Sequence, residues 1–281
     1  MSRCFNRYKM TLWLLVTVFF LGACAPVVVV DVTPDVRGAK GMVASAHPLA
    51  SQVGVDILQA GGNAVDAAVA VGFALGIVEP NASGIGGGGL MLIRFGDSGK
   101  VVFIDSREKA PATATPDMFE LDEKGRVKPD ERGFNPVAIG GRSIAVPGEI
   151  AGLLTALDQY GTMSRAEVIQ PAIERARQGV PVSEVLASMI AANYDTLVTF
   201  RASEEIYLTD GFPKLAGETV SNTDLADTLE MIAQQGRDAF YTGRVAESIV
   251  AAVQADGGII TLEDLASYDA SFRNPVTGTY R

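Results

Sequence analysis

The sequence contains very little cysteine and histidine. Its 281 residues include two cysteines, Cys4 and Cys24, and a single histidine, His47. Because both cysteines lie near the start, the rest of the chain can form no internal disulfide and has no free thiol. Zinc sites built from histidine and cysteine are excluded, and a Ser–His pair could use only His47. We instead expect His47 at the entry of a helix, because Pro48 and a helical pattern follow it.

Positive charge is also scarce. The chain has 23 lysines and arginines against 33 acidic residues, which gives a net charge of −10 at pH 7. So acidic a chain is a poor match for nucleic acid or for an anionic lipid surface. No nucleic-acid partner is therefore predicted. With 48% hydrophobic residues, the chain can still bury a substantial core.

The first residues have the pattern of an export signal. A basic start leads into an apolar run at 10–21 that ends in "LGAC". About a dozen apolar residues are fewer than the roughly 20 that a spanning helix needs, but they suit the core of a signal peptide. "LGAC" resembles the lipobox of bacterial lipoproteins, in which the cysteine becomes the lipidated N-terminus. The prediction is a signal peptide at 1–23, lipid on Cys24, a tether at 24–40 and a folded region at 41–281, held on the periplasmic side of a bacterial membrane; an ordinary export signal is the alternative.

Regular secondary structure is expected along most of the folded region. Asn63 precedes a stretch to Val78 that is apolar except for Asp66, which is typical of a capped, buried helix; its length makes a membrane span the weaker alternative. Capping boxes of the form S/T-x-x-D/E begin at positions 164, 221 and 261. In chain order, the patterns predict a strand at 41–46, a helix from 48 to the glycines at 61 and 62, the helix at 63–78, a hairpin of strands at 90–95 and 101–106, a charged loop at 120–135, helices beginning near 149, 164, 221 and 261, and a strand starting within 274–281.

Five glycines lie within six positions at 84–89, in the stretch "SGIGGGGLMLIR". Gly84, Gly86 and Gly89 match G-x-G-x-x-G, and Asp105 follows at about the distance expected of a ribose-binding acid. A dinucleotide site, however, needs the glycines to follow a strand and open a helix, and here the predicted order is reversed. No cofactor is therefore predicted. We expect positive φ angles or a close backbone approach, either for packing or at the border of a ligand site.

The order of several motifs resembles the gamma-glutamyltransferase family, also known as gamma-glutamyl transpeptidase or glutathione hydrolase. The motifs run from about residue 41 to the end: "GMVASAHPLASQVGVDILQAGGNAVDAAVAVGFALGIVEP", "SGIGGGGLMLIR", "DSREKAPATAT", "AVPGEIAGLLTALDQYGTM", "VIQPAIERARQGVPV" and "ITLEDLASYDASFRNPVTGTYR".

The resemblance implies an α+β fold, an αββα sandwich of the N-terminal-nucleophile hydrolase type, here incomplete and helix-rich. It also implies a precursor that cleaves itself, so that a new N-terminal threonine attacks a gamma-glutamyl amide such as that of glutathione. The acyl group then passes to water or to an amino-acid or peptide acceptor. A threonine whose own α-amine is the adjacent base needs neither cysteine nor histidine.

Arg107, in "DSREKAP", matches the family arginine that pairs with the α-carboxylate of the substrate. A guanidinium suits this role because its planar fork can bind both carboxylate oxygens. The alternative is a structural ion pair with Asp105 or Glu108. We interpret Glu108 as a support for the loop, and Gly86, Gly87, Gly88 and Gly89 as framework beside the pocket.

The family's nucleophilic threonine lies beyond residue 281, so no catalytic residue and no metal ligand is predicted in this chain. We expect the chain alone neither to process itself nor to turn over substrate, and to need a C-terminal part as its partner. The competing hypothesis is a truncated, inactive lipoprotein of the same fold that at most binds ligand. The reading frame past Arg281 would distinguish the two.

Overall fold

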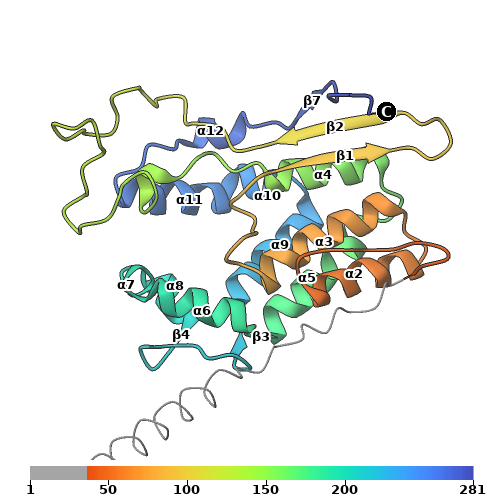
Figure 1. Cartoon of the computed structure of the whole chain (residues 1–281), viewed down its shortest axis with the longest axis horizontal. Helices are drawn as coiled ribbons and strands as arrows, with labels where there is room; N and C mark the ends of the chain where they lie inside the picture. The colour runs from red at the N-terminus through yellow and green to blue at the C-terminus, as the bar shows by residue number, and fades with distance from the viewer. Residues whose placement is uncertain (1–36, 281) are drawn as a thin grey trace, which may run out of the picture. The chain divides into compact units, whose positions relative to one another are not determined.

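A small antiparallel sheet lies over a body of helices in the computed structural model, which describes residues 37–280 (Figure 1). Residues 41–281 cluster as one compact unit. The predicted signal peptide, Cys24 and most of the predicted tether lie outside the described residues.

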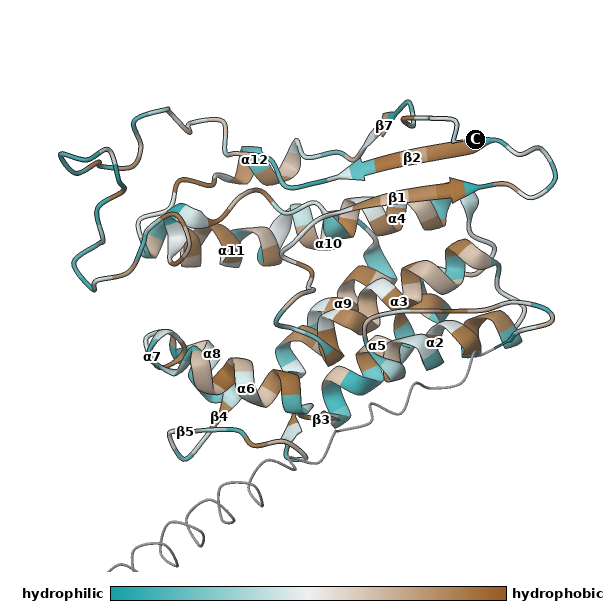
Figure 2. Ribbon diagram, viewed as in Figure 1, coloured by the Kyte–Doolittle hydropathy of each residue, from teal (hydrophilic) through white to brown (hydrophobic). Residues whose placement is uncertain are grey.

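The sheet has the strand order β1-β2-β7, with β1 at Gly89–Arg94, β2 at Val101–Ser106 and β7 at Ser271–Arg273. The predicted hairpin is confirmed, with Gly89 opposite Ser106 at its open end. Side chains alternate in burial along both long strands, as expected for a sheet that is covered by helices on one face. The hydrophobic colour of β1 and β2 extends along both strands (Figure 2).

Four helices form the core beneath the sheet: α2 (Pro48–Gln59), α3 (Ala64–Val78), α4 (Glu149–Tyr160) and α5 (Arg165–Gln178). All four match predicted helices. His47 is the N-cap of α2, where its Nδ1 accepts the N–H of Leu49 at 3.2 Å. Asn63 caps α3, and Asp66 returns a hydrogen bond to the Asn63 N–H, so α3 begins with a capping box.

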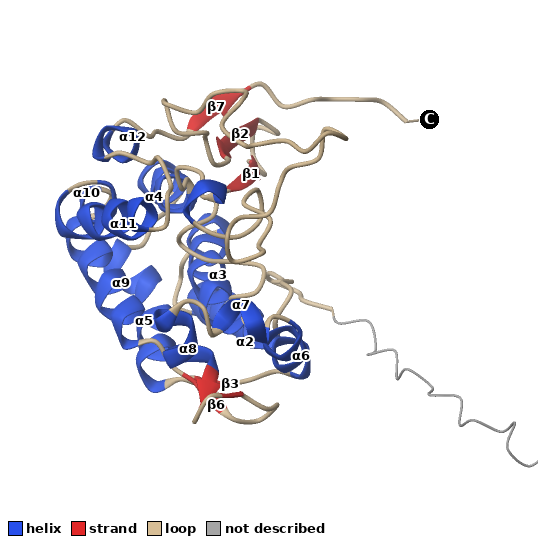
Figure 3. Cartoon of the chain, turned by 90° about the vertical axis from the view of Figure 1, so that its left-hand side faces the viewer, coloured by secondary structure: helices blue, strands red, loops and turns tan. Residues whose placement is uncertain are grey.

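The remaining elements are shorter. They are η1 (Gly141–Ser143), α6 (Glu184–Ala192), α7 (Tyr194–Leu197), α8 (Arg201–Tyr207), α9 (Thr223–Gln235), α10 (Asp238–Tyr241), α11 (Gly243–Ala255), α12 (Leu262–Ala266) and the two-residue strands β3 (Val180–Pro181), β4 (Leu208–Thr209), β5 (Phe212–Pro213) and β6 (Thr219–Val220). Helix accounts for most of the regular structure, and β3 and β6 lie at the end of the helical body away from the sheet (Figure 3).

Three predicted details are wrong. Residues 41–46 form no strand; no described strand pairs with them, and Val43 instead packs beside Gly54 of α2. Helix α9 is capped by Asn222 rather than by Ser221. The last strand, β7, precedes the segment 274–280, in which no regular structure forms.

Within residues 37–280, no helix has the length and apolar character that crossing a membrane requires. In the same part of the chain, no group of three or more His, Cys, Asp or Glu side chains is arranged to hold a metal ion.

Candidate substrate-carboxylate site

Arg107 lies directly after the last residue of β2. Its side chain is 64% exposed, and its Nε lies 3.3 Å from Oε2 of Glu108. Asp105, the other acid within reach in the sequence, accepts the backbone N–H of Arg107 at 3.0 Å and forms its ion pair with Arg273. Among the described residues, the two terminal nitrogens of Arg107 donate no hydrogen bond. They are therefore open to a carboxylate, which a guanidinium binds with two parallel bonds.

The glycine run packs against the backbone that carries Arg107. A Cβ built on Gly88 would lie 2.3 Å from the carbonyl oxygen of Ser106 and 3.2 Å from the Cα of Arg107. Glycine is needed here for a close approach of two backbones, which is one of the two reasons predicted from the sequence. The other reason is wrong, because none of the glycines at 84–89 has a positive φ.

The same run also caps a helix. The carbonyl oxygen of Gly87 accepts the backbone N–H groups of Gly148 and Glu149 at 2.8 and 2.9 Å. These groups belong to the start of α4, where helical N–H groups otherwise lack a partner. A phosphate bound to a glycine-rich loop would need such N–H groups free. The geometry therefore agrees with the exclusion of a dinucleotide site.

Ser106 connects the sheet to these backbones. It is 5% exposed, and its hydroxyl donates to the carbonyl oxygen of Gly89 at 3.0 Å. Cβ atoms on Gly148 and Gly152 of the α4 start would lie 2.0 and 2.2 Å from the carbonyl oxygen and Oγ of Ser106. Glycines on both sides thus allow the chain to pass between β1 and α4 and to present Arg107.

Two carboxylates lie beside this bend. Burial raises the pKa of Glu149 above its usual value, and the negative charge of Glu108 raises it further. The Glu149 side chain lies where a Cβ on Gly89 would be 3.3 Å from Oε2 and one on Gly72 would be 3.7 Å from Oε1. Glu108 is the one that contacts Arg107, so the predicted supporting role of Glu108 agrees with its position.

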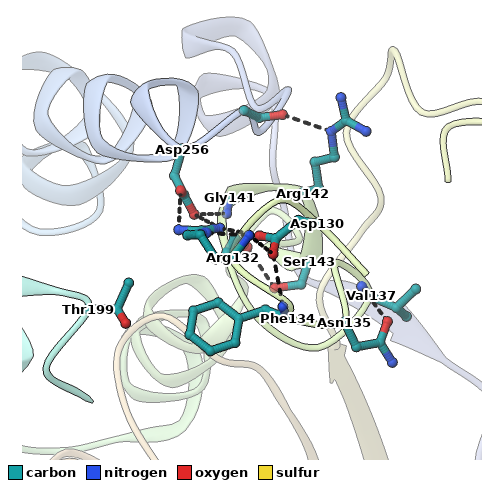
Figure 4. A network of polar contacts seen from close by, with 12 residues as sticks. Asp130, Arg132, Phe134, Asn135, Val137, Gly141, Arg142, Ser143, Thr199 and Asp256 are labelled. Carbon is teal, nitrogen blue, oxygen red and sulfur yellow. Dashed lines mark hydrogen bonds and ion pairs between the residues drawn. The ribbon is translucent and has the colours of Figure 1, made fainter. Parts of the chain in front are cut away.

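The long loop between Arg107 and α4 is fixed at its far end. Arg132 pairs with Asp130 at 2.8 Å and with Asp256, at the end of α11, at 2.7 Å. Asp256 also accepts the N–H of Gly141 at 2.8 Å. Figure 4 shows these side chains converging beside Phe134, whose ring lies 5.3 Å from the Arg132 guanidinium.

Five cavities in the described part of the chain lie elsewhere. The most polar has a volume of about 560 Å³ and is lined by the Asp130–Arg132–Asp256 group. Its central charges pair with one another, which suits an anchor for the loop rather than a reactive site. An apolar cavity of about 480 Å³ borders Gly86 and has Arg244 as its only charged lining residue. Arg107 is thus presented on an open surface.

Comparison with known proteins identifies the family. The model of the gamma-glutamyltranspeptidase family matches residues 50–281. The chain is 45% identical to the glutathione hydrolase proenzyme of Bacillus subtilis (strain 168) over 244 residues, covering 87% of this chain and 40% of that protein. For the glutathione hydrolase proenzyme of Escherichia coli (strain K12), the identity is 47% over 252 residues, covering 89% and 42%. The crystal structure of Helicobacter pylori gamma-glutamyltranspeptidase superposes with a TM-score of 0.82 at 40% identity, covering 88% of this chain and 69% of that one.

The chain belongs to the gamma-glutamyltranspeptidase family, and its fold is of the N-terminal-nucleophile hydrolase type. It is mixed α+β, as predicted from the sequence. It spans about two-fifths of the length of the two proenzymes.

Sequence reasoning missed several residues that shape this site. Ser106, Gly148 and Tyr268 all contact the backbone at 106–107. Tyr268 lies 161 positions from Arg107 in the sequence, and no local pattern connects residues so far apart. Gly148 had a signal, since it lies in the "AVPGE" motif that precedes a helix.

Proposed function

We propose that this chain supplies the carboxylate-binding part of an enzyme that transfers the gamma-glutamyl group of glutathione, or of a related amide, to water or to an amino-acid or peptide acceptor. Arg107 binds the α-carboxylate of the gamma-glutamyl group. An N-terminal threonine outside residues 1–281 is the nucleophile, and its free α-amine is the base. This part of the family assignment rests on the resemblance of the motifs.

The observation that carries the proposal is the state of Arg107. Its guanidinium has one acidic neighbour, Glu108, while Asp105 is occupied by Arg273. An arginine with a purely structural role would be expected to use its terminal nitrogens within the protein. Here they are exposed beside a bend whose backbone is fixed by Gly88 and Gly148. Such a fixed guanidinium can bind a carboxylate without first ordering its own loop.

The test uses the complete reading frame that contains residues 1–281, expressed as wild type and as Arg107→Ala. We expect kcat/KM for a gamma-glutamyl anilide to fall at least about 30-fold, since loss of one partner of a charge pair typically costs 2–5 kcal/mol. Arg107→Lys should recover only part of the loss, because an ammonium lacks the fork.

Arg94→Ala is the matched control, because Arg94 is exposed at the other end of the same hairpin. It should leave kcat/KM within about twofold of wild type, as expected for a surface change away from the site. Equal, small effects of Arg107→Ala and Arg94→Ala would contradict the proposed role.

We further propose that residues 1–23 direct export and that Cys24 is lipidated, placing the protein at the periplasmic side of a bacterial membrane. The support is the "LGAC" pattern after an apolar run. Mass spectrometry of the N-terminal peptide should find a diacylglyceryl cysteine, since stable anchoring takes more than one acyl chain. Cys24→Ser should release the protein from the membrane fraction; an unmodified Cys24 would contradict the proposal.

The second candidate is an inactive lipoprotein of this fold, favoured by the absence of a predicted nucleophile within the chain. A reading frame that continues past Arg281 to a processing threonine supports the enzyme. A stop codon there, together with no turnover, supports the inactive protein.

A further inference from the structure

The backbone carbonyl of Arg107 lies past the end of the sheet. The last β2 residue that pairs with β7 is Asp105, opposite Ser271, and β2 ends at Ser106. The strand ladder therefore provides no donor for the Arg107 carbonyl. An unpaired carbonyl at this turn would let the peptide rotate and move the guanidinium with it.

A tyrosine from the far end of the described chain supplies that donor. The hydroxyl of Tyr268 donates to the Arg107 carbonyl oxygen at 2.8 Å, and Tyr268 is only 2% exposed. On the other side of the residue, the Arg107 N–H donates to Asp105 Oδ1 at 3.0 Å. The N–H and the carbonyl of Arg107 are thus each fixed by a side chain.

The Tyr268 ring is itself held from several directions. It stacks on the ring of Tyr241, with centroids 5.8 Å apart and an interplanar angle of 6°. The Lys109 ammonium lies 4.8 Å from the ring centroid, and Arg237 donates to the Tyr268 carbonyl oxygen. A Cβ on Gly148 would lie 2.2 Å from the hydroxyl oxygen, so glycine leaves the space that the hydroxyl occupies.

The hydroxyl also keeps its proton. Burial, followed by the negative charges of Asp105 and Glu108, raises the pKa of Tyr268 to about 12. A protonated phenol can donate to a carbonyl, whereas a phenolate cannot. The donor is therefore available throughout the neutral and mildly alkaline range.

We propose that Tyr268 is a positioning residue for the substrate site, which acts by orienting the Arg107 peptide so that the guanidinium meets the substrate carboxylate. The inference rests on the proposed function of Arg107. Tyr268 touches neither the substrate nor the reacting atoms. Its contribution should therefore appear in substrate binding rather than in the chemical step.

The test compares Tyr268→Phe with Tyr241→Phe in the protein made from the complete reading frame. Tyr241 is a matched control because its buried hydroxyl also donates to a carbonyl, that of Pro147 at 2.9 Å, and not to Arg107. Both variants keep their rings, so the stack is preserved and both lose one buried hydrogen bond. Their melting temperatures should fall by similar amounts.

We expect Tyr268→Phe to raise KM for a gamma-glutamyl anilide by about three- to tenfold with kcat within twofold, the size expected for one hydrogen bond. Tyr241→Phe should leave KM unchanged. In an Arg107→Ala background, Tyr268→Phe should have no further effect on KM, because the side chain that it orients is gone.

The outcomes separate the two claims. If Arg107→Ala raises KM but Tyr268→Phe behaves like Tyr241→Phe, the inference is wrong and the proposed function stands. An unchanged KM in Arg107→Ala would overturn the proposed function and this inference with it. An equal KM increase from Tyr268→Phe with and without Arg107 would show that Tyr268 acts on the protein generally, and would also overturn the inference.

Discussion

Gly88 and Ser106 lie so close that a Cβ on Gly88 would be 2.3 Å from the Ser106 carbonyl oxygen. Gly86, two positions earlier in the same run, has no atom within 4 Å of its Cβ position. The glycines of this segment therefore differ in what they do, although the sequence shows them as equivalent. Gly88 allows the bend to pass the Arg107 segment, and Gly86 faces open space.

Gly88→Ala should destabilise the protein by about 2–3 kcal/mol, because a backbone carbonyl cannot move aside as a flexible side chain can. Gly86→Ala should change the free energy of unfolding by no more than about 0.5 kcal/mol. Urea unfolding of the two variants measures the difference. Equal stabilities would contradict the packing described for the bend.

Asp66 connects α3 to the start of α5. It is fully buried, and its carboxylate accepts the Thr162 hydroxyl at 2.7 Å and the N–H groups of Thr162, Met163 and Asn63 at 2.7–3.2 Å. Asp66→Asn replaces an acceptor by a donor facing these N–H groups and should cost about 3 kcal/mol. Asp56→Asn is the control, since the exposed Asp56 accepts only from Gln52; an equally small loss in both would contradict this account.

The pH dependence of that loss has a defined sign. Burial alone would raise the pKa of Asp66, but hydrogen bonds from Thr162, Asn63 and Met163 outweigh it and hold the pKa below its usual value. A lowered folded-state pKa stabilises above the unfolded-state value and is lost as the pH falls through the folded value. The difference between wild type and Asp66→Asn should therefore be full at pH 7 and shrink below roughly pH 4.

Glu149 should show the opposite trend. Burial and then the charge of Glu108 raise its pKa, so its folded-state stabilisation is present below the unfolded-state pKa and is lost as the pH rises through the folded value. Glu149→Gln should gain stability relative to wild type as the pH rises from about 4 to 8. Urea midpoints across this range measure it, and Glu108→Gln should reproduce part of the gain. A wild type that gains on the variant with rising pH would contradict the assignment.

The Arg132–Asp256 contact should control the mobility of the loop before α4. Asp256→Ala removes the partner of Arg132 and the acceptor for Gly141, and partly exposed pairs of this kind contribute about 1 kcal/mol. Limited proteolysis should cut within 120–142 faster than in wild type. Asp122→Ala, whose partners Lys124 and Arg126 lie within the loop, should not loosen the anchor; equal cleavage in both variants would contradict this role.

The sequence predicted those elements whose signals are local. Asn63, Ser164 and Thr261 cap helices as expected, because a capping residue acts within its own turn. Residues 41–46 were predicted as a strand from β-type side chains, but a strand exists only where another strand pairs with it. Ser221 and Asn222 are both good caps, so the pattern could not fix which one starts α9.

The site was predictable only in part, for a similar physical reason. The motif around Arg107 pointed to the arginine, and the order of helix and strand excluded a dinucleotide loop. The contacts that fix its backbone come from Gly88, Gly148 and Tyr268. These contacts join segments that are distant in the sequence, and only the folded chain brings them together.

The most direct test of the central claim is the release of product from a gamma-glutamyl anilide by residues 24–281 expressed alone. The claim is that this chain binds the substrate carboxylate through Arg107 while the attacking hydroxyl lies elsewhere. It predicts no turnover and no self-cleavage by this polypeptide. Robust turnover by residues 24–281 that Arg107→Ala abolishes would contradict it.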